Sequence, residues 1–492
     1  MKTNLASPIT GRIREKNILK QFLTSSKAEF MALYGRRRIG KTYLIKNFFS
    51  QESCVFFHTA GIQGGRIAEQ LEQFSKQIGA TFYGGASIAS CRRWLDSFEE
   101  LTKAINQIPS GKKIVIFFDE FPWMATRRSG LVQALDYYWN RYWVHVNRIK
   151  LIICGSSASW IIEKIINDKG GLYNRVTRTM QLDSFTLSET QALLNYMKIK
   201  LSPRQILDLY MVLGGVPHYL ALIRKGLSAY QCLDELCFQK DGPLVNEFDR
   251  LFASLFNESK LYADLVKIIA KYRYGIGQAQ LINESTLSSD GGRVVHRLKE
   301  LEDSGFILSF IPYGHSDKGI YYRIVDEFIL FYLYWIKPNL TTIRKHDRTP
   351  GYWLAKSQSP SWKSWAGYAF EAICYKHLVQ IRKALSIDAG ATVGSWRYAP
   401  RINKESGAQI DLLFDRSDDT ITICEIKYNE KPFVIDKAYA AILRNKIEVF
   451  RKITKTQKQI FLAFITISGL KPTVYSEDMI TQVLTLTDLF NE

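Results

Sequence analysis

The sequence has few cysteines and no long hydrophobic run. Its seven cysteines among 492 residues are an odd number, and none forms a Cys-x-x-Cys pair with zinc-like spacing. Scattered cysteines within apolar segments indicate reduced thiols rather than a disulfide scaffold or a structural zinc site. No apolar run reaches the length needed to cross a bilayer, and the first residues lack the apolar core of a signal peptide. We therefore expect a cytoplasmic protein without a membrane partner.

Acidic residues are also in short supply. The chain has 47 Asp and Glu residues against 66 Lys and Arg residues, which gives a formal net charge of +19. Such an excess favours a polyanionic partner through phosphate contacts, so DNA is the expected partner. The alternative is a charge that serves solubility alone. The hydrophobic share of 46% is that of a folded protein, and the length of 492 residues implies about three domains.

Short apolar strands alternate with helical patterns through the first third of the chain. We expect these strands at residues 30–34, 53–59, 114–118 and 151–154. Fully apolar strands separated by helices are typical of a parallel sheet that is covered on both faces. The sequence therefore predicts an α/β fold with a parallel-sheet core over residues 1–182.

A glycine-rich motif follows the first of these strands and begins a helix. It reads Gly35-Arg36-Arg37-Arg38-Ile39-Gly40-Lys41-Thr42, is followed by Tyr43, and satisfies the P-loop pattern in full. Its glycines let backbone N–H groups face phosphate oxygens, and the helix N-terminus adds positive potential. Lys41 is expected to reach the β- and γ-phosphates of ATP, and the Thr42 hydroxyl to ligate Mg²⁺.

Acidic residues at the end of a second strand complete this predicted site. The strand 114–118 runs into Asp119 and Glu120. Asp119 at the end of a buried strand can hold Mg²⁺, and Glu120 can orient and deprotonate the attacking water.

Two further positions are candidates for contact with the γ-phosphate. The strand 151–154 ends in Gly155-Ser156-Ser157, and we expect Ser156 to sense that phosphate, although a plain turn also fits these residues. Arg175 is the candidate arginine finger, and Arg178 is the alternative. Either arginine equally fits a solvated surface position.

These motifs together resemble the archaeal-type ATPase family, which is close to the AAA+ and STAND classes. Ile9-Thr10-Gly11-Arg12-Ile13-Arg14-Glu15 looks like that family's opening Gly-Arg-x-x-Glu motif, and Gly214-Gly215-Val216-Pro217 resembles its lid motif. The resemblance implies ATP with Mg²⁺, Gly11 and Arg12 beside the adenine, and Pro217 near the base. It also implies that the helical patterns of residues 183–255 form a lid that moves with the nucleotide state.

A helix–helix–helix–hairpin series over residues 256–337 predicts a winged-helix module. The turn of its wing is expected at residues 312–318. The basic amphipathic stretch 293–301 would be the recognition helix, but winged helices also serve as protein–protein modules, and both interpretations stay open. The aromatic stretch 328–336 is expected to be core, because its apolar density is too continuous for an exposed stacking platform.

The remaining chain is expected to comprise a polar linker at 338–360 and a last module at 361–492. In that module, Glu371 lies on a predicted helix, Asp411 begins a strand, and Glu425 and Lys427 end the next one. Glu425 and Lys427 are two residues apart and so share a face of their strand. Grouped carboxylates can bind Mg²⁺ and a lysine can activate a water, which is the chemistry of phosphodiester cleavage.

This arrangement resembles the PD-(D/E)xK nuclease superfamily, and it also looks like the C-terminal domain often fused to this ATPase family. The resemblance implies an α/β nuclease-like domain in which Asp411 and Glu425 bind metal, and Glu371 and Lys427 join them in catalysis. It departs from the motif at Ile410, where a proline often stands. A nuclease fold that only binds DNA, or a mere salt-bridged edge strand, are the alternatives.

The leading interpretation is a Mg²⁺-dependent ATPase that couples its nucleotide state to DNA binding or cleavage by its C-terminal modules. The second is a nucleotide-gated switch that binds DNA or protein without cutting. The third is a protein-remodelling ATPase whose basic charge is incidental. A homo-oligomer is compatible with all three, and in it Arg175 could serve the ATP of a neighbouring subunit.

Overall fold

The structure is a computed structural model that describes residues 9–126, 128–167, 172, 174–287, 290–315, 319–345, 351–400 and 407–491. The chain divides into two compact units, residues 1–184 with 299–305 and residues 185–298 with 306–492. Residues 316–318 of the expected wing turn and 346–350 of the expected linker lie outside the described residues. The finer division into five parts stays a prediction. No helix of the described residues is long and apolar enough to span a membrane.

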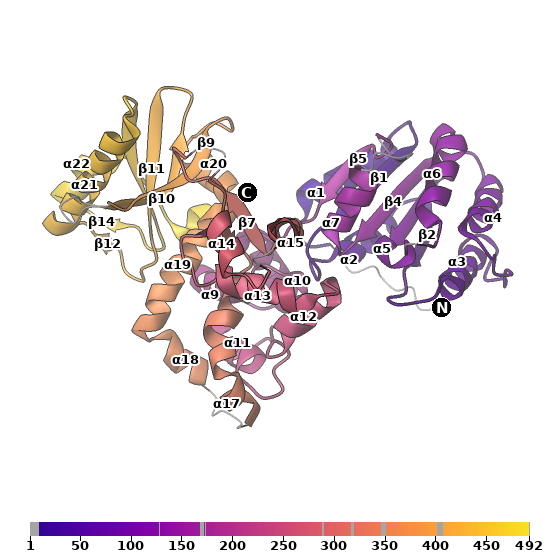
Figure 1. The fold of residues 1–492 in the computed structure, drawn as a ribbon, viewed down its shortest axis with the longest axis horizontal. Helices are drawn as coiled ribbons and strands as arrows, with labels where there is room; N and C mark the ends of the chain where they lie inside the picture. Colours follow the sequence, from indigo (N-terminus) through magenta and orange to yellow (C-terminus); the bar gives the residue numbers. More distant parts are fainter. Residues whose placement is uncertain are drawn as a thin grey trace. The chain divides into compact units, whose positions relative to one another are not determined.

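A parallel five-stranded sheet forms the centre of the first unit (Figure 1). Its strands lie in the order β2-β3-β4-β1-β5, and every neighbouring pair is parallel. They are β1 (Glu29–Tyr34), β2 (Cys54–Ala60), β3 (Lys113–Asp119), β4 (Ile149–Gly155) and β5 (Arg178–Gln181). The α/β fold with a parallel sheet is therefore confirmed.

Helices pack on both faces of this sheet (Figure 1). Phe30 and Ala32 of β1 lie in one hydrophobic core with α3, α4 and α6, whereas Met31 and Leu33 lie in another with α1 and α2. Burial on both faces explains why the strands are continuous apolar runs. The helices are α1 (Ile13–Thr24), α2 (Lys41–Phe49), α3 (Ile67–Phe82), α4 (Trp94–Asn106), α5 (Phe121–Met124), α6 (Leu131–Arg141) and α7 (Ala158–Ile161).

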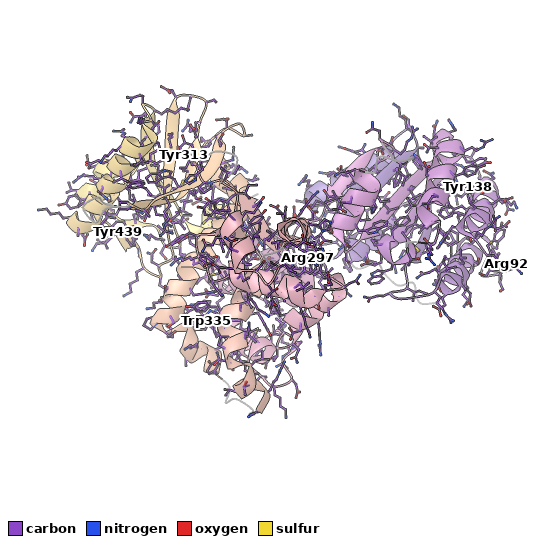
Figure 2. The ribbon with its side chains drawn as sticks, in the orientation of Figure 1. Arg92, Tyr138, Arg297, Tyr313, Trp335 and Tyr439 are labelled. Atoms are coloured by element: carbon purple, nitrogen blue, oxygen red, sulfur yellow. The ribbon has the colours of Figure 1, made fainter. Side chains whose placement is uncertain are left out.

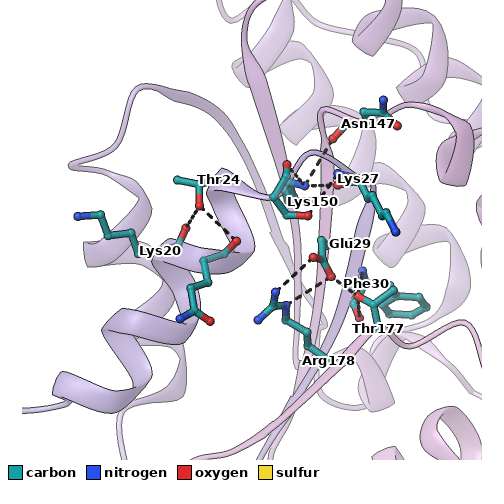
Figure 3. A network of polar contacts seen from close by, with 11 residues as sticks. Lys20, Thr24, Lys27, Glu29, Phe30, Asn147, Lys150, Thr177 and Arg178 are labelled. Atoms are coloured by element: carbon teal, nitrogen blue, oxygen red, sulfur yellow. Dashed lines mark hydrogen bonds and ion pairs between the residues drawn. The ribbon is translucent and has the colours of Figure 1, made fainter.

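A polar network lies at the end of the sheet where β1 begins (Figure 3). The ammonium group of the buried Lys150 donates to the backbone carbonyl oxygens of Ser25 (3.0 Å), Lys27 and Asn147 (3.4 Å). Nearby, Glu29 forms an ion pair with Arg178, with 3.4 Å between Oε2 and Nε. Arg178 is therefore fixed at the amino end of β1, opposite the end from which the P-loop leaves.

The second unit begins with helices and a small antiparallel sheet. The first helices are α8 (Leu187–Tyr196), α9 (Pro203–Leu213), α10 (Pro217–Leu220), α11 (Ala229–Cys237) and α12 (Glu247–Leu255). A series of α13 (Ser259–Ile269), β6 (Ile276–Gly277), α14 (Gln278–Glu284), α15 (Gly291–Asp303), β7 (Ile307–Phe310) and β8 (Tyr321–Ile324) follows. Its strands form an antiparallel sheet in the order β6-β8-β7.

The basic helix α15 does not present all of its cations outward. Arg297, labelled in Figure 2, is buried and forms an ion pair with Glu258, and its guanidinium carbon lies 5.7 Å from the ring centre of Tyr262. Arg293 is exposed and pairs with Asp290 at 3.0 Å. Arg297 therefore fastens α15 to its own module, which leaves fewer cations for contact with DNA than the sequence suggested.

The aromatic stretch after β8 is core, as predicted. It forms α16 (Glu327–Phe331) and one turn of π-helix at Tyr332–Ile336. Phe331 and Trp335 are buried against Trp353, at 5.0 and 5.5 Å between ring centres, and Figure 2 labels Trp335. The helices that follow are α17 (Leu340–Lys345), α18 (Tyr352–Ser357), α19 (Pro360–Lys376) and α20 (Leu378–Ala384).

A mixed five-stranded sheet ends the chain, in the order β15-β13-β11-β10-β9. The strand β10 is antiparallel to β9 and β11, whereas β13 is parallel to β11 and β15. The elements are β9 (Thr392–Tyr398), β10 (Ala408–Asp415), β11 (Thr420–Lys427), β12 (Phe433–Val434), α21 (Lys437–Thr454), β13 (Gln459–Thr466), β14 (Leu470–Lys471), α22 (Val474–Met479) and β15 (Gln482–Leu484). The chain therefore has a second, β-rich domain at its C-terminal end, and its likeness to a nuclease stays a prediction.

Candidate nucleotide site and carboxylate cluster

The glycine-rich loop leaves β1 and runs directly into α2. Gly35 has φ +144°, and a Cβ atom at this position would overlap the carbonyl oxygen of Leu182, so only glycine fits. The ammonium group of Lys41 is buried and donates to the carbonyl oxygens of Gly35 (2.9 Å) and Arg36 (3.0 Å). Burial lowers the pKa of Lys41. A buried cation inside a loop at a helix N-terminus makes a preformed anion-binding site.

Thr42 and Asp119 meet beside this loop. The Thr42 hydroxyl donates to Oδ2 of Asp119 at 2.7 Å. Burial would raise the pKa of Asp119, but the nearby His58 and the hydrogen bond from Thr42 outweigh it, so the pKa is lowered and the carboxylate stays charged. A hydroxyl and a carboxylate oxygen are ligands that Mg²⁺ prefers, so the residues present fit this ion.

Glu120 and Ser156 are joined at the same edge of the sheet. The Ser156 hydroxyl donates to Oε1 of Glu120 at 2.5 Å, and the Ser156 backbone N–H donates to Oε2 at 3.0 Å. Glu120 has φ +45°, a left-handed conformation that costs energy in a residue other than glycine. The backbone strain and both hydrogen bonds hold this carboxylate in one orientation. Ser156 thus lies beside Glu120, and its role as a sensor of the γ-phosphate stays a prediction.

The opening motif packs on the loop. Arg12 donates to the carbonyl oxygen of Ile39 at 3.3 Å, and Gly11 before it has φ +65°. Tyr43 is 47% exposed on the first turn of α2. Pro217 begins α10 in the second unit, and its role near the base stays a prediction.

The structure does not bring Arg175 to the P-loop of its own chain. Arg175 is exposed and precedes β5, whose first residue Arg178 pairs with Met31 in the register and with Glu29 through its side chain. Both arginines therefore lie toward the amino end of the strands, while the loop 35–42 leaves the carboxyl end of β1. An arginine finger at Arg175 would have to act on a neighbouring subunit.

One residue of the nucleotide site was missed from the sequence. His58 on β2 lies 3.8 Å from Asp119, measured from Nε2 to Oδ2. The register pairs His58 with Phe117 in the neighbouring strand, which brings the imidazole to the same sheet edge as Asp119. Strand neighbours of this kind cannot be read from one sequence.

The four residues of the predicted nuclease site lie in one cluster. The register of β10 and β11 pairs Leu412 with Cys424 and thus sets Asp411 opposite Glu425. Burial and the neighbouring Asp411 raise the pKa of Glu371 to about 7, and burial and Glu425 raise that of Asp411. These acids therefore sense one another's charge across the α19–β10–β11 junction.

Glu425 is held by lysines rather than left open. Its Oε1 accepts from Tyr439 (2.6 Å) and pairs with Lys427 (2.8 Å), and its Oε2 pairs with Lys446 (2.6 Å). Burial would raise the pKa of Glu425, but the two ammonium groups outweigh it and lower it. Within the described ranges, no group of three or more His, Cys, Asp and Glu residues is placed to hold a metal ion. A metal at Asp411 and Glu425 would be a two-carboxylate site, and it stays a prediction.

Tyr439 and Lys446 were also missed from the sequence. Both lie on α21, seven residues apart and so on one helix face. That spacing marks one face of α21, but the sequence alone does not show that this face packs on Glu425. Glu371 is likewise partnered, by Arg273 at 3.1 Å.

Residues 10–223 match the family described as an ATPase domain predominantly from Archaea. The chain carries an archaeal-type P-loop ATPase domain. Residues 332–442 of this P-loop protein match a second family, described as archaeal and bacterial proteins of unknown function.

The chain is similar to several other proteins at low sequence identity. An uncharacterized protein of Methanocaldococcus jannaschii is 24% identical over 88% of this chain and 90% of its own length. Among solved structures, a Walker-type ATPase of Pyrococcus abyssi is 18% identical, with a TM-score of 0.46, over 66% of this chain and 96% of its own. The ORC2 protein of Aeropyrum pernix in ADPNP–ADP complexes is 15% identical, with a TM-score of 0.41, over 69% and 96%.

Proposed function

We propose that the protein hydrolyses ATP with Mg²⁺ and couples its nucleotide state to DNA binding or cleavage by its C-terminal modules. The contact between Thr42 and Asp119 carries the ATPase part, because it sets two Mg²⁺-type oxygens beside the buried Lys41. Mg²⁺ bound here would neutralise charge on the phosphates. Lys41 would exchange its two loop carbonyls for phosphate oxygens.

Glu120 is the proposed general base of this reaction. Ser156 holds both of its carboxylate oxygens, so that the carboxylate faces the carboxyl edge of the sheet where the loop begins. A fixed carboxylate can orient and deprotonate a water, which contributes about 10²- to 10⁴-fold to a rate. Ser156 would report the phosphate state through the same contact.

The DNA part of the proposal rests on charge and on the C-terminal module. The net charge of +19 favours phosphate contacts, and the series α13–β8 has the helices and antiparallel strands of a winged helix. The coupled acids Glu371, Asp411 and Glu425 with Lys427 offer the residues of phosphodiester cleavage.

A specific observation also favours the nucleotide-gated switch without nuclease activity. Both carboxylate oxygens of Glu425 are already bonded, to Lys427, Lys446 and Tyr439. A metal ion would have to displace at least one of them. In this second candidate function, the module binds DNA or a protein partner and the ion pairs are structural.

ATP hydrolysis by the full chain, with and without double-stranded DNA, tests the first part. We expect turnover that requires Mg²⁺ and falls at least a hundredfold in Lys41→Ala and Glu120→Gln. Lys46→Ala is the matched control, because Lys46 is exposed on the same helix. Turnover in Lys41→Ala equal to that of Lys46→Ala would refute the ATPase site. Turnover that DNA does not change would favour a protein partner.

A cleavage assay in Mg²⁺ or Mn²⁺ separates the two candidate functions. The nuclease predicts cutting that is lost in Asp411→Asn and in Glu425→Gln, and cutting retained by both variants would exclude this site. The switch predicts salt-sensitive binding of DNA and no cutting by the parent chain. Two variants are needed because Glu425→Gln leaves the half-buried Lys427 and Lys446 without their carboxylate.

A further inference from the structure

A cavity of about 370 Å³ lies within the second unit, between the small antiparallel sheet and the C-terminal sheet. Its walls come from the turn after α13, from β7 and β8, from α19, and from β9 and β10. A backbone hydrogen bond from Tyr313 N–H to the carbonyl oxygen of Ser395 (2.9 Å) joins the two sides. The Tyr313 hydroxyl adds a bond to Asp415 at 2.9 Å, and Figure 2 labels this tyrosine. Hydrogen bonds within the unit therefore hold the two sides of the cavity together.

Arginine side chains on aromatic rings line this cavity. The guanidinium carbon of Arg323 lies 3.9 Å from the ring centre of Tyr375, and that of Arg397 lies 4.8 Å from the ring centre of Tyr274. Arg273 pairs with Glu371 at 3.1 Å. Among the residues that the structure describes, Arg323 and Arg397 have no ion pair with a carboxylate. Their positive charge is therefore available to a ligand.

Ring stacking fixes these arginines without using up their donors. A guanidinium on an aromatic face keeps its N–H groups in the plane, where they match phosphate oxygens in pairs. Tyr274 is 41% exposed and offers its ring to a base. Bases expose their faces in a single strand but cover them by stacking in a duplex. The volume lies within the range of small-ligand pockets, which suits a nucleotide rather than a double helix.

We propose that this cavity binds the terminal nucleotides of a single-stranded nucleic acid, with phosphates on Arg323 and Arg397 and a base on Tyr274. This inference deepens the proposed function. The binding of the strand stands without that function, and only the consequence for cleavage rests on it. Asp411 and Glu371 are also on the cavity wall, so a strand end held here would lie beside the proposed cleavage residues. The site would then act on ends or unpaired segments, not on intact duplex.

Fluorescence anisotropy of a labelled single-stranded octanucleotide tests binding in EDTA, where cleavage cannot contribute. We expect Arg323→Gln and Arg397→Gln each to weaken binding about tenfold or more. The matched control is Arg451→Gln, an exposed arginine on α21 away from the cavity, which we expect to weaken it less than twofold. Equal losses in the cavity variants and in the control would overturn the proposal. The absence of cleavage in the nuclease assay would not bear on this binding result, because the binding is measured without metal.

Competition distinguishes the occupants. A duplex with the same phosphate concentration should compete at less than one tenth of the strength of the single strand; equal competition overturns the proposal. A nucleoside monophosphate that competes as well as the octanucleotide would identify a free nucleotide as the ligand. This result would also overturn the proposal that the cavity binds a strand. Cross-linking of a 5-iodouracil octanucleotide to the unaltered chain tests the same site without any variant, so a variant that misfolds cannot affect the result. Cross-links are expected in peptides that carry Tyr274, Tyr321 or Tyr375, and cross-links confined to other peptides contradict the site.

Discussion

A buried histidine should make the second unit sensitive to mild acid. His377 lies between α19 and α20, donates from Nδ1 to the carbonyl oxygen of Ile373 (2.8 Å) and accepts at Nε2 from the backbone N–H of Leu187 (3.1 Å). Both ring nitrogens are thus used by the neutral imidazole. Burial, together with the nearby Lys376, lowers the pKa of His377 to about 4 from its usual 6.5.

The direction and size of the effect follow from these two pKa values. Between pH 6.5 and pH 4 the unfolded chain binds a proton at His377 that the folded chain does not, so the free energy of unfolding falls as the pH falls. The loss reaches about 2 kcal/mol at pH 5.0 relative to pH 7.5. Protonation of Nε2 would also turn it from acceptor to donor against the Leu187 N–H, and so undock the start of α8.

Urea unfolding read by peptide-level hydrogen exchange can isolate this effect, because it follows the two units separately. His377→Gln keeps an acceptor for Leu187 but does not titrate. It should be less stable than the parent at pH 7.5, yet lose about 2 kcal/mol less than the parent between pH 7.5 and 5.0. His218→Gln, at an exposed histidine of the same unit, should keep the parent's pH dependence. Equal losses in the parent and in His377→Gln would refute the reasoning.

Two substitutions test the packing of each unit by thermal unfolding. Lys150→Met removes the ammonium donor from three carbonyl oxygens of the network in Figure 3, of which that of Ser25 keeps a hydrogen bond from Lys113 (2.7 Å). The oxygens of Lys27 and Asn147 lose this donor, so the variant should cost the first unit about 2–3 kcal/mol, against less than about 0.5 kcal/mol for the exposed Lys112→Met; equal costs would contradict the network. Gly215→Ala forces φ +65° on a side chain whose Cβ would overlap the carbonyl oxygen of Phe185, and should cost more than about 2 kcal/mol. Gly226→Ala has φ +89° but, among the described residues, no atom within 4 Å of its Cβ, and should cost only about 1 kcal/mol; a cost equal to that of Gly215→Ala would argue against the close approach.

The local sequence predicted the ATPase core well, because its strands and turns are set by short-range chemistry. The helix over residues 41–49 matches α2, since the glycine-rich turn fixes where it begins. The buried strand before Asp119 and Glu120 is a fully apolar run and so could be recognised as β3. The meeting of Thr42 with Asp119 follows from the parallel order of the strands.

Edge strands and contacts between distant segments could not be predicted in this way. The strands β5 and β9 are polar or only partly buried, so they lack the apolar signal of central strands. The partners of Glu425 on α21 and the cavity beside α19 depend on how elements far apart in the chain pack. The stretch 293–301 was a candidate recognition helix, but only the structure shows that its Arg297 forms an ion pair with Glu258.

A second buried group suggests that the helices after residue 185 and the carboxylate cluster move as one body. Asp208 on α9 is fully buried and accepts from the hydroxyls of Tyr230 (2.7 Å) and Tyr428 (2.9 Å), and pairs with Arg204 (3.3 Å). Tyr428 directly follows Lys427. A shift of α9 alone would keep the bond to Arg204, which lies on the same helix, but would break the bonds from Tyr230 and Tyr428 to a buried carboxylate. Such a loss costs about 1–3 kcal/mol for each buried bond, whereas a joint shift keeps both bonds. The hydrogen bond between His377 and the Leu187 N–H likewise ties the start of α8 to the end of α19. A nucleotide signal that reaches these helices would therefore be carried to the end of β11, where Lys427 meets Glu425.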